Sequence, residues 1–332
     1  MTYLPPMRRS LVLAPLLALI AASPVAPATD RLPIETSLIA QFRKGSADTR
    51  FGALEFLGGF QFSSSDSRLG GLSAIRFRPN GRDFVAVQDT GEWVTGSIER
   101  DAAGRLKGLS SLSIDAMLDA RGRSPSKFDI DAEGLAMQPG RLIVSYERKH
   151  RIDAYPDPGY EKARPRSVGM VIPSRELRTN GGIETLVAAP AESPLAGALV
   201  AVAERSIDGD GNLFAAVLDG PRKGVFKVAR HQPWAVTDGA FLPDGDLLLL
   251  ERRFSYLGGV GMRLRRIEAD AIKPGALVDG KVLIEADMGA EIDNMEGLDV
   301  LVENGETRII IASDDNGSFL QRNLMLEFRL VD

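Results

Sequence analysis

One pattern occurs five times along the sequence: a Gly-rich or acidic turn with a small apolar pair leads through a tight turn into a β-type run that ends on a carboxylate. The first copy begins at Gly70 and the fifth begins at Asn294. The closing carboxylates are Asp89, Glu147, Glu204, Glu251 and Asp314. They lie 58, 57, 47 and 63 residues apart, which suits one four-stranded sheet plus loops per copy. We therefore predict an all-β protein, a β-propeller with four-stranded antiparallel blades.

Turn residues separate the first two strands of four copies. These residues supply the positive φ angles that a hairpin needs. They are Pro79-Asn80-Gly81, Pro139-Gly140, Pro243-Asp244-Gly245 and Asn304-Gly305. The turns and the repeat thus predict the same blades.

The fifth copy ends one strand short of a blade. The segment from Phe51 to Phe62 precedes the first copy and is spare. We predict that both termini share one blade, because this removes the exposed sheet edge. Insertions at 115–130 and 156–167 leave room for additional strands, so the five visible repeats fit five or six blades.

The N-terminus resembles an export signal. A basic pair, Arg8-Arg9, precedes an apolar stretch from Leu11 to Ala22 and a small-residue cleavage site, Ala26-Pro27-Ala28. We expect a signal peptide over 1–28, cleaved after Ala28, a leader or short helix over 29–50 and the propeller over 51–332. The expected location is periplasmic or secreted, without stable membrane insertion after cleavage, by either the general or the twin-arginine route.

Composition excludes several classes of protein. Without residues 1–28 the chain has 38 basic and 45 acidic residues, a net charge of −7, which argues against nucleic-acid binding. The chain has no cysteine, and no Gly-x-Ser-x-Gly, P-loop or dinucleotide motif. His150 and His231 are the only histidines, and we expect both on loops or at the surface. A closed propeller needs no partner chain, so we expect a monomer.

The recurrent acids predict a metal site. If each carboxylate-ended run is the inner strand of its blade, its terminal acid lies near one mouth of the central channel. So many carboxylates cannot all stay ionised unless positive charge lies among them, and oxygen ligands without histidine favour Ca²⁺, with Mg²⁺ also possible. The candidate metal ligands are Asp89, Glu147, Glu204, Asp238, Glu251, Asn294 and Asp314.

Arginines offer an equally good alternative to a metal. Arg148, Arg205 and Arg252 directly follow three of these acids. Successive strand residues face opposite ways, so on a regular strand an adjacent Glu and Arg would not contact each other, but each could contact a partner in the next blade. The acids would then form a purely structural ring of ion pairs. The same guanidinium groups could instead bind phosphate oxygens.

Several short motifs together carry a family resemblance. They are Asp131-Ala132-Glu133-Gly134-Leu135, Glu204-Arg205-Ser206, Thr237-Asp238-Gly239, Leu250-Glu251-Arg252-Arg253-Phe254, Asp293-Asn294-Met295-Glu296-Gly297-Leu298 and Ser313-Asp314-Asp315-Asn316. With them the chain resembles the exported bacterial phytase-like family, described by its esterase-like activity of phytase, over about residues 51–330. The resemblance implies a propeller, export and hydrolysis of phosphate or carboxylic esters.

Together these features predict a metal-dependent hydrolase of phosphoric monoesters with a small-molecule substrate. In this prediction Glu133 or Glu296 orients the attacking water, and Arg148, Arg205 and Arg252 stabilise charge at phosphorus. Two alternatives remain open. One is a lactonase or carboxylic esterase on the same scaffold, and the other is a non-catalytic periplasmic binding propeller with a structural cation.

Overall fold

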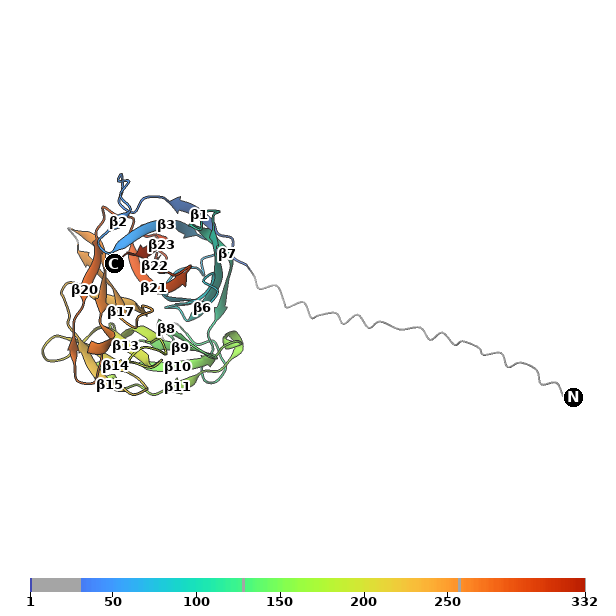
Figure 1. Ribbon diagram of the computed structural model, residues 1–332. Helices are drawn as coiled ribbons and strands as arrows, with labels where there is room; N and C mark the ends of the chain where they lie inside the picture. The colour runs from blue at the N-terminus through green and yellow to red at the C-terminus, as the bar shows by residue number, and fades with distance from the viewer. Residues whose placement is uncertain (2–30, 127–128, 256–257, 332) are drawn as a thin grey trace.

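The computed structural model describes residues 1, 31–126, 129–255 and 258–331, which form a five-bladed β-propeller (Figure 1). The predicted propeller class is thus confirmed, with five blades rather than six. Apart from Met1, the predicted signal peptide lies outside the described residues. Within them, no helix is long and apolar enough to cross a membrane.

Four blades follow one another along the chain, each an antiparallel sheet in strand order. The first has β4 (Leu72–Phe77), β5 (Asp83–Gln88), β6 (Glu92–Arg100) and β7 (Leu106–Ala116). The second has β8 (Ala132–Gln138), β9 (Arg141–Tyr146), β10 (Arg151–Pro156) and β11 (Arg166–Val168). The third has β12 (Ile183–Ala188), β13 (Leu199–Ile207), β14 (Leu213–Val217) and β15 (Gly224–Val228), with β19 (Leu277–Val278) added parallel to β15. The fourth has β16 (Ala235–Phe241), β17 (Leu247–Ser255), β18 (Gly259–Ile267) and β20 (Lys281–Ala286).

The fifth blade joins the two ends of the chain. Its strands are β21 (Asn294–Glu303), β22 (Glu306–Asp314), β23 (Asn323–Leu330), β3 (Leu54–Ser63) and β1 (Glu35–Ile39), with the short β2 (Arg50–Phe51) beside β3. Closure occurs where β23 pairs with β3, as predicted from the spare N-terminal segment. Part of the segment predicted as a leader forms β1 on the outer edge of this blade. Short 3-10 turns lie at Tyr160–Lys162, Ser174–Glu176 and Ala269–Ala271.

The innermost strands are β4, β8, β12, β16 and β21, which pack against one another in a closed ring. They are the first strands of the five copies, so the condition that the carboxylate-ended runs are the inner strands does not hold. Close packing at the axis explains the order. A side chain at Gly134 would come within 2.5 Å of the Glu184 backbone oxygen on the next inner strand, and one at Gly297 within 2.9 Å of Ile75.

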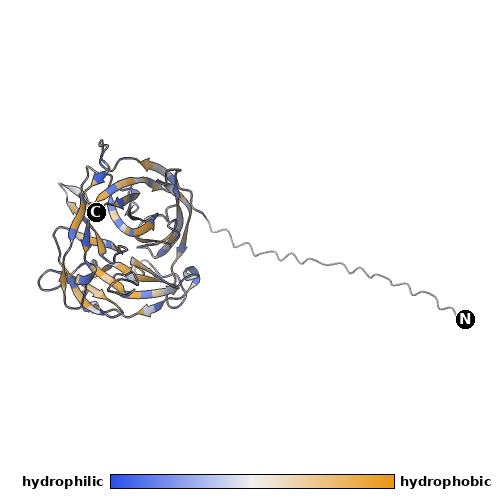
Figure 2. Cartoon of the chain, in the orientation of Figure 1, coloured by the Kyte–Doolittle hydropathy of each residue, from blue (hydrophilic) through white to orange (hydrophobic). Residues whose placement is uncertain are grey.

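The hydrophobic core fills the spaces between neighbouring blades, because alternate residues of a strand face opposite sides. Trp93 of the first blade, for example, packs with Tyr146 of the second in one cluster, and Phe214 of the third belongs to the next cluster. The strands accordingly carry most of the hydrophobic colour in Figure 2. Packing between the blades thereby fixes the positions of the inner strands that surround the channel.

Candidate metal centre at one mouth of the channel

Each inner strand contains a β-bulge near its start. The pairing with the second strand shifts register there in all five blades. A bulge redirects the side chain that it carries. The residues at this position are Ser73, Glu133, Glu184, Thr237 and Glu296. Three blades therefore place a glutamate at the same height of the propeller, close to the end of the channel.

We call this end of the channel the acidic mouth and define it by Asp131, Glu133, Glu147, Glu184, Glu204 and Glu296. Inner and second strands are antiparallel, so the terminal acids of the second strands lie beside the starts of the inner strands. The predicted gathering of acids at one mouth thus holds for Glu147 and Glu204, although their strands are second from the axis.

The glutamates of the acidic mouth raise the pKa values of one another. Burial, then the charges of Glu147 and Asp131, raises the pKa of Glu133 well above its ordinary value. Burial and the charge of Glu133 do the same to the pKa of Glu184. Burial also raises the pKa of Glu296 to about 7, against the opposing effect of Arg252. Negative charge is therefore poorly neutralised here, which favours a bound cation.

Asp131, Glu133 and Glu147 form the tightest group. One carboxylate oxygen from each lies within 4.8 Å of the others. Calcium takes oxygen ligands at about 2.3–2.6 Å, so three oxygens this close can contact one ion. The donor set consists of carboxylates without nitrogen or sulfur, as Ca²⁺ and Mg²⁺ prefer. These residues therefore fit a hard divalent cation, and zinc or copper fits them less well.

Backbone contacts hold Glu147 in place. Its Oε1 accepts hydrogen bonds from the backbone N–H groups of Gly181 and Gly182 at 2.6 and 2.5 Å, where the chain enters β12 of the next blade. Asp314 of the fifth blade does the same for the first blade. It accepts hydrogen bonds from the backbone N–H groups of Gly71 at 2.6 Å and Leu72 at 3.0 Å, where the chain enters β4. Both acids thus tie the end of a second strand to the start of the next inner strand.

Arginines surround one side of the acidic mouth. Arg252 pairs with Glu296 at 2.7 Å and approaches Glu204 at 3.9 Å. It also donates to the Asn294 side-chain oxygen, while the Asn294 amide donates to Glu296 at 2.8 Å. The pair between Arg252 and Glu296 joins two neighbouring blades, as the sequence analysis predicted.

The other two arginines contact acids of their own blades. Arg205 pairs with the adjacent Glu204 at 2.9 Å, and Arg148 with Asp131 across the sheet at 2.5 Å. The prediction that an adjacent Glu and Arg would not meet is therefore wrong for Arg205, and Arg148 contacts an acid of its own blade rather than of the next. Arg205 follows a break in the pairing of β13, where the regular alternation of side chains is lost. Arg148 has a left-handed backbone conformation, with φ of 52°, so its side chain does not follow the alternation of the preceding strand.

Two predicted metal ligands lie in buried ion pairs. Glu251 accepts hydrogen bonds from Arg263 at 2.6 Å and Arg265 at 2.7 Å, inside the fourth blade. Asp238 forms a two-pronged pair with Arg76 of the first blade, at 2.8 and 2.9 Å. In this arrangement their oxygens already have cationic partners.

The remaining predicted residues lie near the acidic mouth. Asp89 lies against Gly71, where a side chain would collide with its carboxylate, and its charge helps to raise the pKa of Glu133. His150 was expected at the surface or on a loop. The loop position is confirmed, because His150 lies in the turn between β9 and β10, where it is half-buried beside Gly182.

Two residues of the acidic mouth were missed by sequence reasoning. Asp131 stands two positions before Glu133 in one of the motifs of the family resemblance, but it does not end a β-run, which was the signal used for the ligands. Glu184 occupies the bulge position of the third copy, where Glu133 and Glu296 stand in the second and fifth. An alignment of the five copies on their first strands would have revealed it.

The family model described as "Phytase-like: Esterase-like activity of phytase" matches residues 67–317. A PQQ-bound aldose sugar dehydrogenase from Streptomyces coelicolor is similar in structure, with a TM-score of 0.45, 14% identity, and coverage of 90% of this chain and 99% of that one. A glutaminyl cyclase from Myxococcus xanthus matches with a TM-score of 0.42 and 15% identity, over 91% of this chain and all of that one. No curated protein sequence matches significantly. Because the family model covers most of the chain, this protein belongs to the phytase-like family.

Proposed function

We propose that the protein is a metal-dependent hydrolase of phosphoric monoesters and that the acidic mouth is its active site. The observation that carries the proposal is the convergence of Asp131, Glu133 and Glu147, whose oxygens lie within 4.8 Å of one another beside a group of arginines. A small-molecule ester with a charged phosphate needs such paired features: a cation site and nearby guanidinium donors.

Asp131, Glu133 and Glu147 would hold the divalent cation, and Ca²⁺ suits their all-oxygen set. When bound, such an ion neutralises phosphate charge and lowers the pKa of a coordinated water. Glu147 is a well-positioned ligand because two backbone N–H groups fix one of its oxygens and leave the other for the ion.

Glu296 and the arginines would act on the substrate. Glu296 is held by Arg252 and Asn294 and reaches the mouth from the fifth blade, where its free carboxylate oxygen could orient a water and accept its proton. The side chains of Arg205 and Arg148 are 48% and 35% exposed. They can therefore donate to phosphate oxygens while keeping their acidic partners, and Arg252 would stabilise charge at phosphorus from deeper in the mouth.

The experiment is hydrolysis of p-nitrophenyl phosphate by the purified protein, with Ca²⁺ and after chelation. We expect turnover with the cation only, and its loss in Glu133→Gln. The matched control is Glu35→Gln, the same chemical change on the exposed outer strand β1, which should retain full activity. Equal activity before and after chelation, or an active Glu133→Gln protein, would refute the proposal. Calcium-dependent stabilisation without turnover of any ester would instead support a binding propeller.

A second candidate is a carboxylic esterase or lactonase at the same site. Two observations favour it: the family description names esterase-like activity, and each of the three arginines is already paired with a carboxylate. Hydrolysis of p-nitrophenyl acetate, which has the same leaving group, separates the two candidates. Faster release from the acetate, unaffected by Arg205→Ala, would favour the carboxylic ester.

We also propose that the chain is exported to the periplasm or secreted. The support is the basic, apolar and small-residue pattern over residues 1–28. Expression of the full chain in a Gram-negative host, followed by N-terminal sequencing of the exported protein, should give Thr29 as the first residue. An intact N-terminus in the cytoplasmic fraction would refute export.

A further inference from the structure

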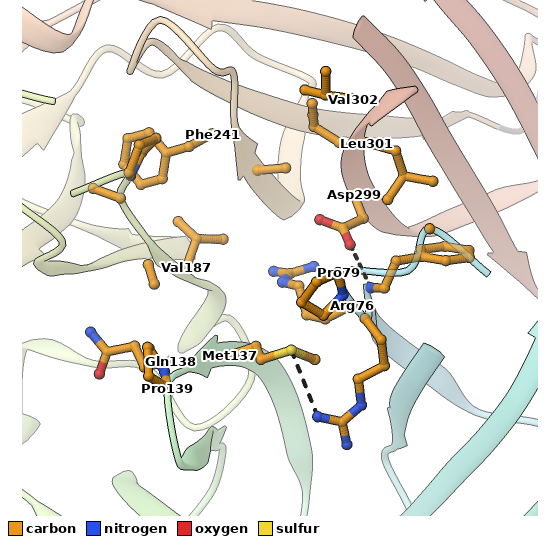
Figure 3. A pocket seen from close by; sticks show the side chains of 18 of the residues that line it. Arg76, Pro79, Met137, Gln138, Pro139, Val187, Phe241, Asp299, Leu301 and Val302 are labelled. Carbon is orange, nitrogen blue, oxygen red and sulfur yellow. Dashed lines mark hydrogen bonds between the residues drawn. The ribbon is translucent and has the colours of Figure 1, made fainter. Parts of the chain in front are cut away.

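A cavity lies at the end of the channel opposite the acidic mouth, where the inner strands end. We call it the opposite mouth and define it by Arg76, Met137, Val187, Phe241, Asp299 and Val302, which come from all five blades (Figure 3). Its volume is about 1030 Å³. This is at the upper end of the size range of small-molecule sites, about 300–1,000 Å³. The cavity is therefore large enough for an organic ligand.

Arg76 forms the floor of the opposite mouth. Its guanidinium crosses the channel from β4 and donates to the backbone oxygens of Leu298 on β21, Leu186 on β12 and Gly239 on β16, at 2.8, 3.2 and 3.1 Å. Both terminal nitrogens also bind Asp238. Arg76 thus ties four of the five inner strands together near the axis. Its terminal donors are occupied, so it offers little to an anion.

The walls are mainly apolar. Met137, Val187, Phe241 and Val302 line them, and Val302 is 63% exposed. The other arginine of the cavity, Arg78, forms a two-pronged pair with Asp157 and lies over the ring of Tyr160. Apolar walls with few polar groups are typical of small-molecule sites. Both arginines have carboxylate partners, so neither attracts a phosphate or carboxylate to this mouth.

Asp299 supplies the charge that remains. Arg76 pairs with Asp238 and Arg78 with Asp157, and Glu303, which also lines the cavity, pairs with Arg308 at 2.9 Å. These three pairs cancel, so Asp299 leaves a net charge of −1. Asp299 accepts the backbone N–H of Phe77 at 2.6 Å, and Figure 3 shows its carboxylate at the edge of the cavity. Among the described residues, none of the hydrogen bonds to Asp299 comes from a cationic side chain. A carboxylate of this kind at the base of apolar walls attracts a cation with an apolar body.

We propose that the opposite mouth binds a small organic amine, whose apolar body packs on Phe241 and Met137 and whose ammonium group contacts Asp299. This site is separate from the proposed hydrolase site, because none of the residues that define the acidic mouth lines this cavity. The ligand class follows from the charge of the cavity and from its walls.

The test is calorimetric titration of the purified protein with benzylamine, in the presence of excess Ca²⁺. We expect benzylamine to bind and benzoate, which has the same ring and the opposite charge, not to bind. Asp299→Asn keeps an oxygen for the Phe77 N–H but removes the charge, and it should weaken binding at least about tenfold. Ala188→Trp places a large side chain in the cavity wall and should abolish benzylamine binding. This variant tests the proposal even if Asp299→Asn does not fold.

Glu133→Gln is the control for the acidic mouth, which also carries negative charge. It should bind benzylamine as the unaltered protein does. No benzylamine binding, undiminished binding by folded Asp299→Asn, undiminished binding by Ala188→Trp, or loss in Glu133→Gln alone would each overturn the proposal. None of these results bears on phosphate release, so failure here leaves the hydrolase proposal standing.

Discussion

The carboxylate of Glu147 accepts the backbone N–H of Gly182 at 2.5 Å, so the acid that follows the second strand of one blade fixes the start of the next inner strand. The same glutamate belongs to the group with Asp131 and Glu133 at the acidic mouth. One contact therefore links the assembly of two blades to the geometry of the candidate metal centre. Changes at either residue should affect both.

Gly182→Ala tests this link. A Cβ at this position would lie 2.8 Å from Cε1 of His150 and 3.3 Å from Oε1 of Glu147, so one of these side chains must move. We expect a loss of stability of about 1–3 kcal/mol and a lower calcium affinity, because Glu147 loses its fixed position. Urea unfolding and calcium titration measure the two effects.

Gly169→Ala is the control for this substitution, since a Cβ there meets nothing within 4 Å. It should leave both quantities unchanged. If Gly182→Ala binds calcium with unaltered affinity, the backbone contact does not position Glu147 for the ion.

Glu133→Gln should separate stability from metal binding. Burial and, after it, the like charges of Glu147 and Asp131 oppose ionisation of Glu133, so removing its charge should stabilise the metal-free protein by about 1 kcal/mol. The same change should remove the stabilisation that calcium gives the unaltered protein, about 2.7 kcal/mol at a hundredfold excess over the dissociation constant. Thermal unfolding with Ca²⁺ and with chelator shows both effects. A variant that is less stable without metal would contradict this explanation.

The pair between Arg76 and Asp238 should be a major source of stability at the axis. Both side chains are buried, and Asp238→Asn leaves a buried guanidinium without its counter-charge. We expect a loss of about 3–5 kcal/mol. Glu176→Gln breaks a pair with the 81% exposed Arg175 and should cost less than about 1 kcal/mol. Comparable losses in the two variants, measured by urea unfolding, would show that Arg76 does not tie the inner strands together.

Asp299 should make stability depend on pH. Burial raises the pKa of Asp299 from 3.8 to about 6, against Arg76 and two backbone N–H groups and with a small contribution from Asp238. Between these values the folded protein holds a proton that the unfolded chain has released. The stabilisation that this proton gives the folded protein is therefore complete below about pH 4. It falls by at most about 3 kcal/mol as the pH rises to about 6.

Urea unfolding of the unaltered protein and of Asp299→Asn across pH 4–7 measures this effect. The free energy of unfolding of the unaltered protein should fall relative to that of Asp299→Asn as the pH rises to 6, and the difference should then become constant. A difference that is constant with pH would show that Asp299 titrates normally.

Most of the architecture was predictable from the sequence, because each blade carries its own strand and turn pattern. The hairpin at Asn304-Gly305, for example, has the two positive φ angles that its sequence predicts. The radial order of the strands was not predictable, since both strands of a hairpin read as β-runs. It depends instead on how closely backbones can approach, as at Gly134.

The acidic mouth was predictable only in part. Glu133, Glu147 and Glu296 stand at conspicuous positions of the repeat, and the structure brings them to one end of the channel. The arginine partners of Glu251 and Asp238 come from other strands, 12 to 162 residues away, and no local pattern announces such pairs. Pairing between strands, within a blade for Glu251 and across the ring for Asp238, thus decides which acids remain for a metal ion.

The most direct test of the central claim is phosphate release from inositol hexakisphosphate by the purified protein, with Ca²⁺ and again after chelation. The arrangement of Asp131, Glu133 and Glu147 predicts release that requires the cation and that disappears in Glu133→Gln but not in Glu35→Gln. Release that persists after chelation, or none in either condition, would contradict the assignment of the acidic mouth as a metal-dependent phosphoric-ester hydrolase site.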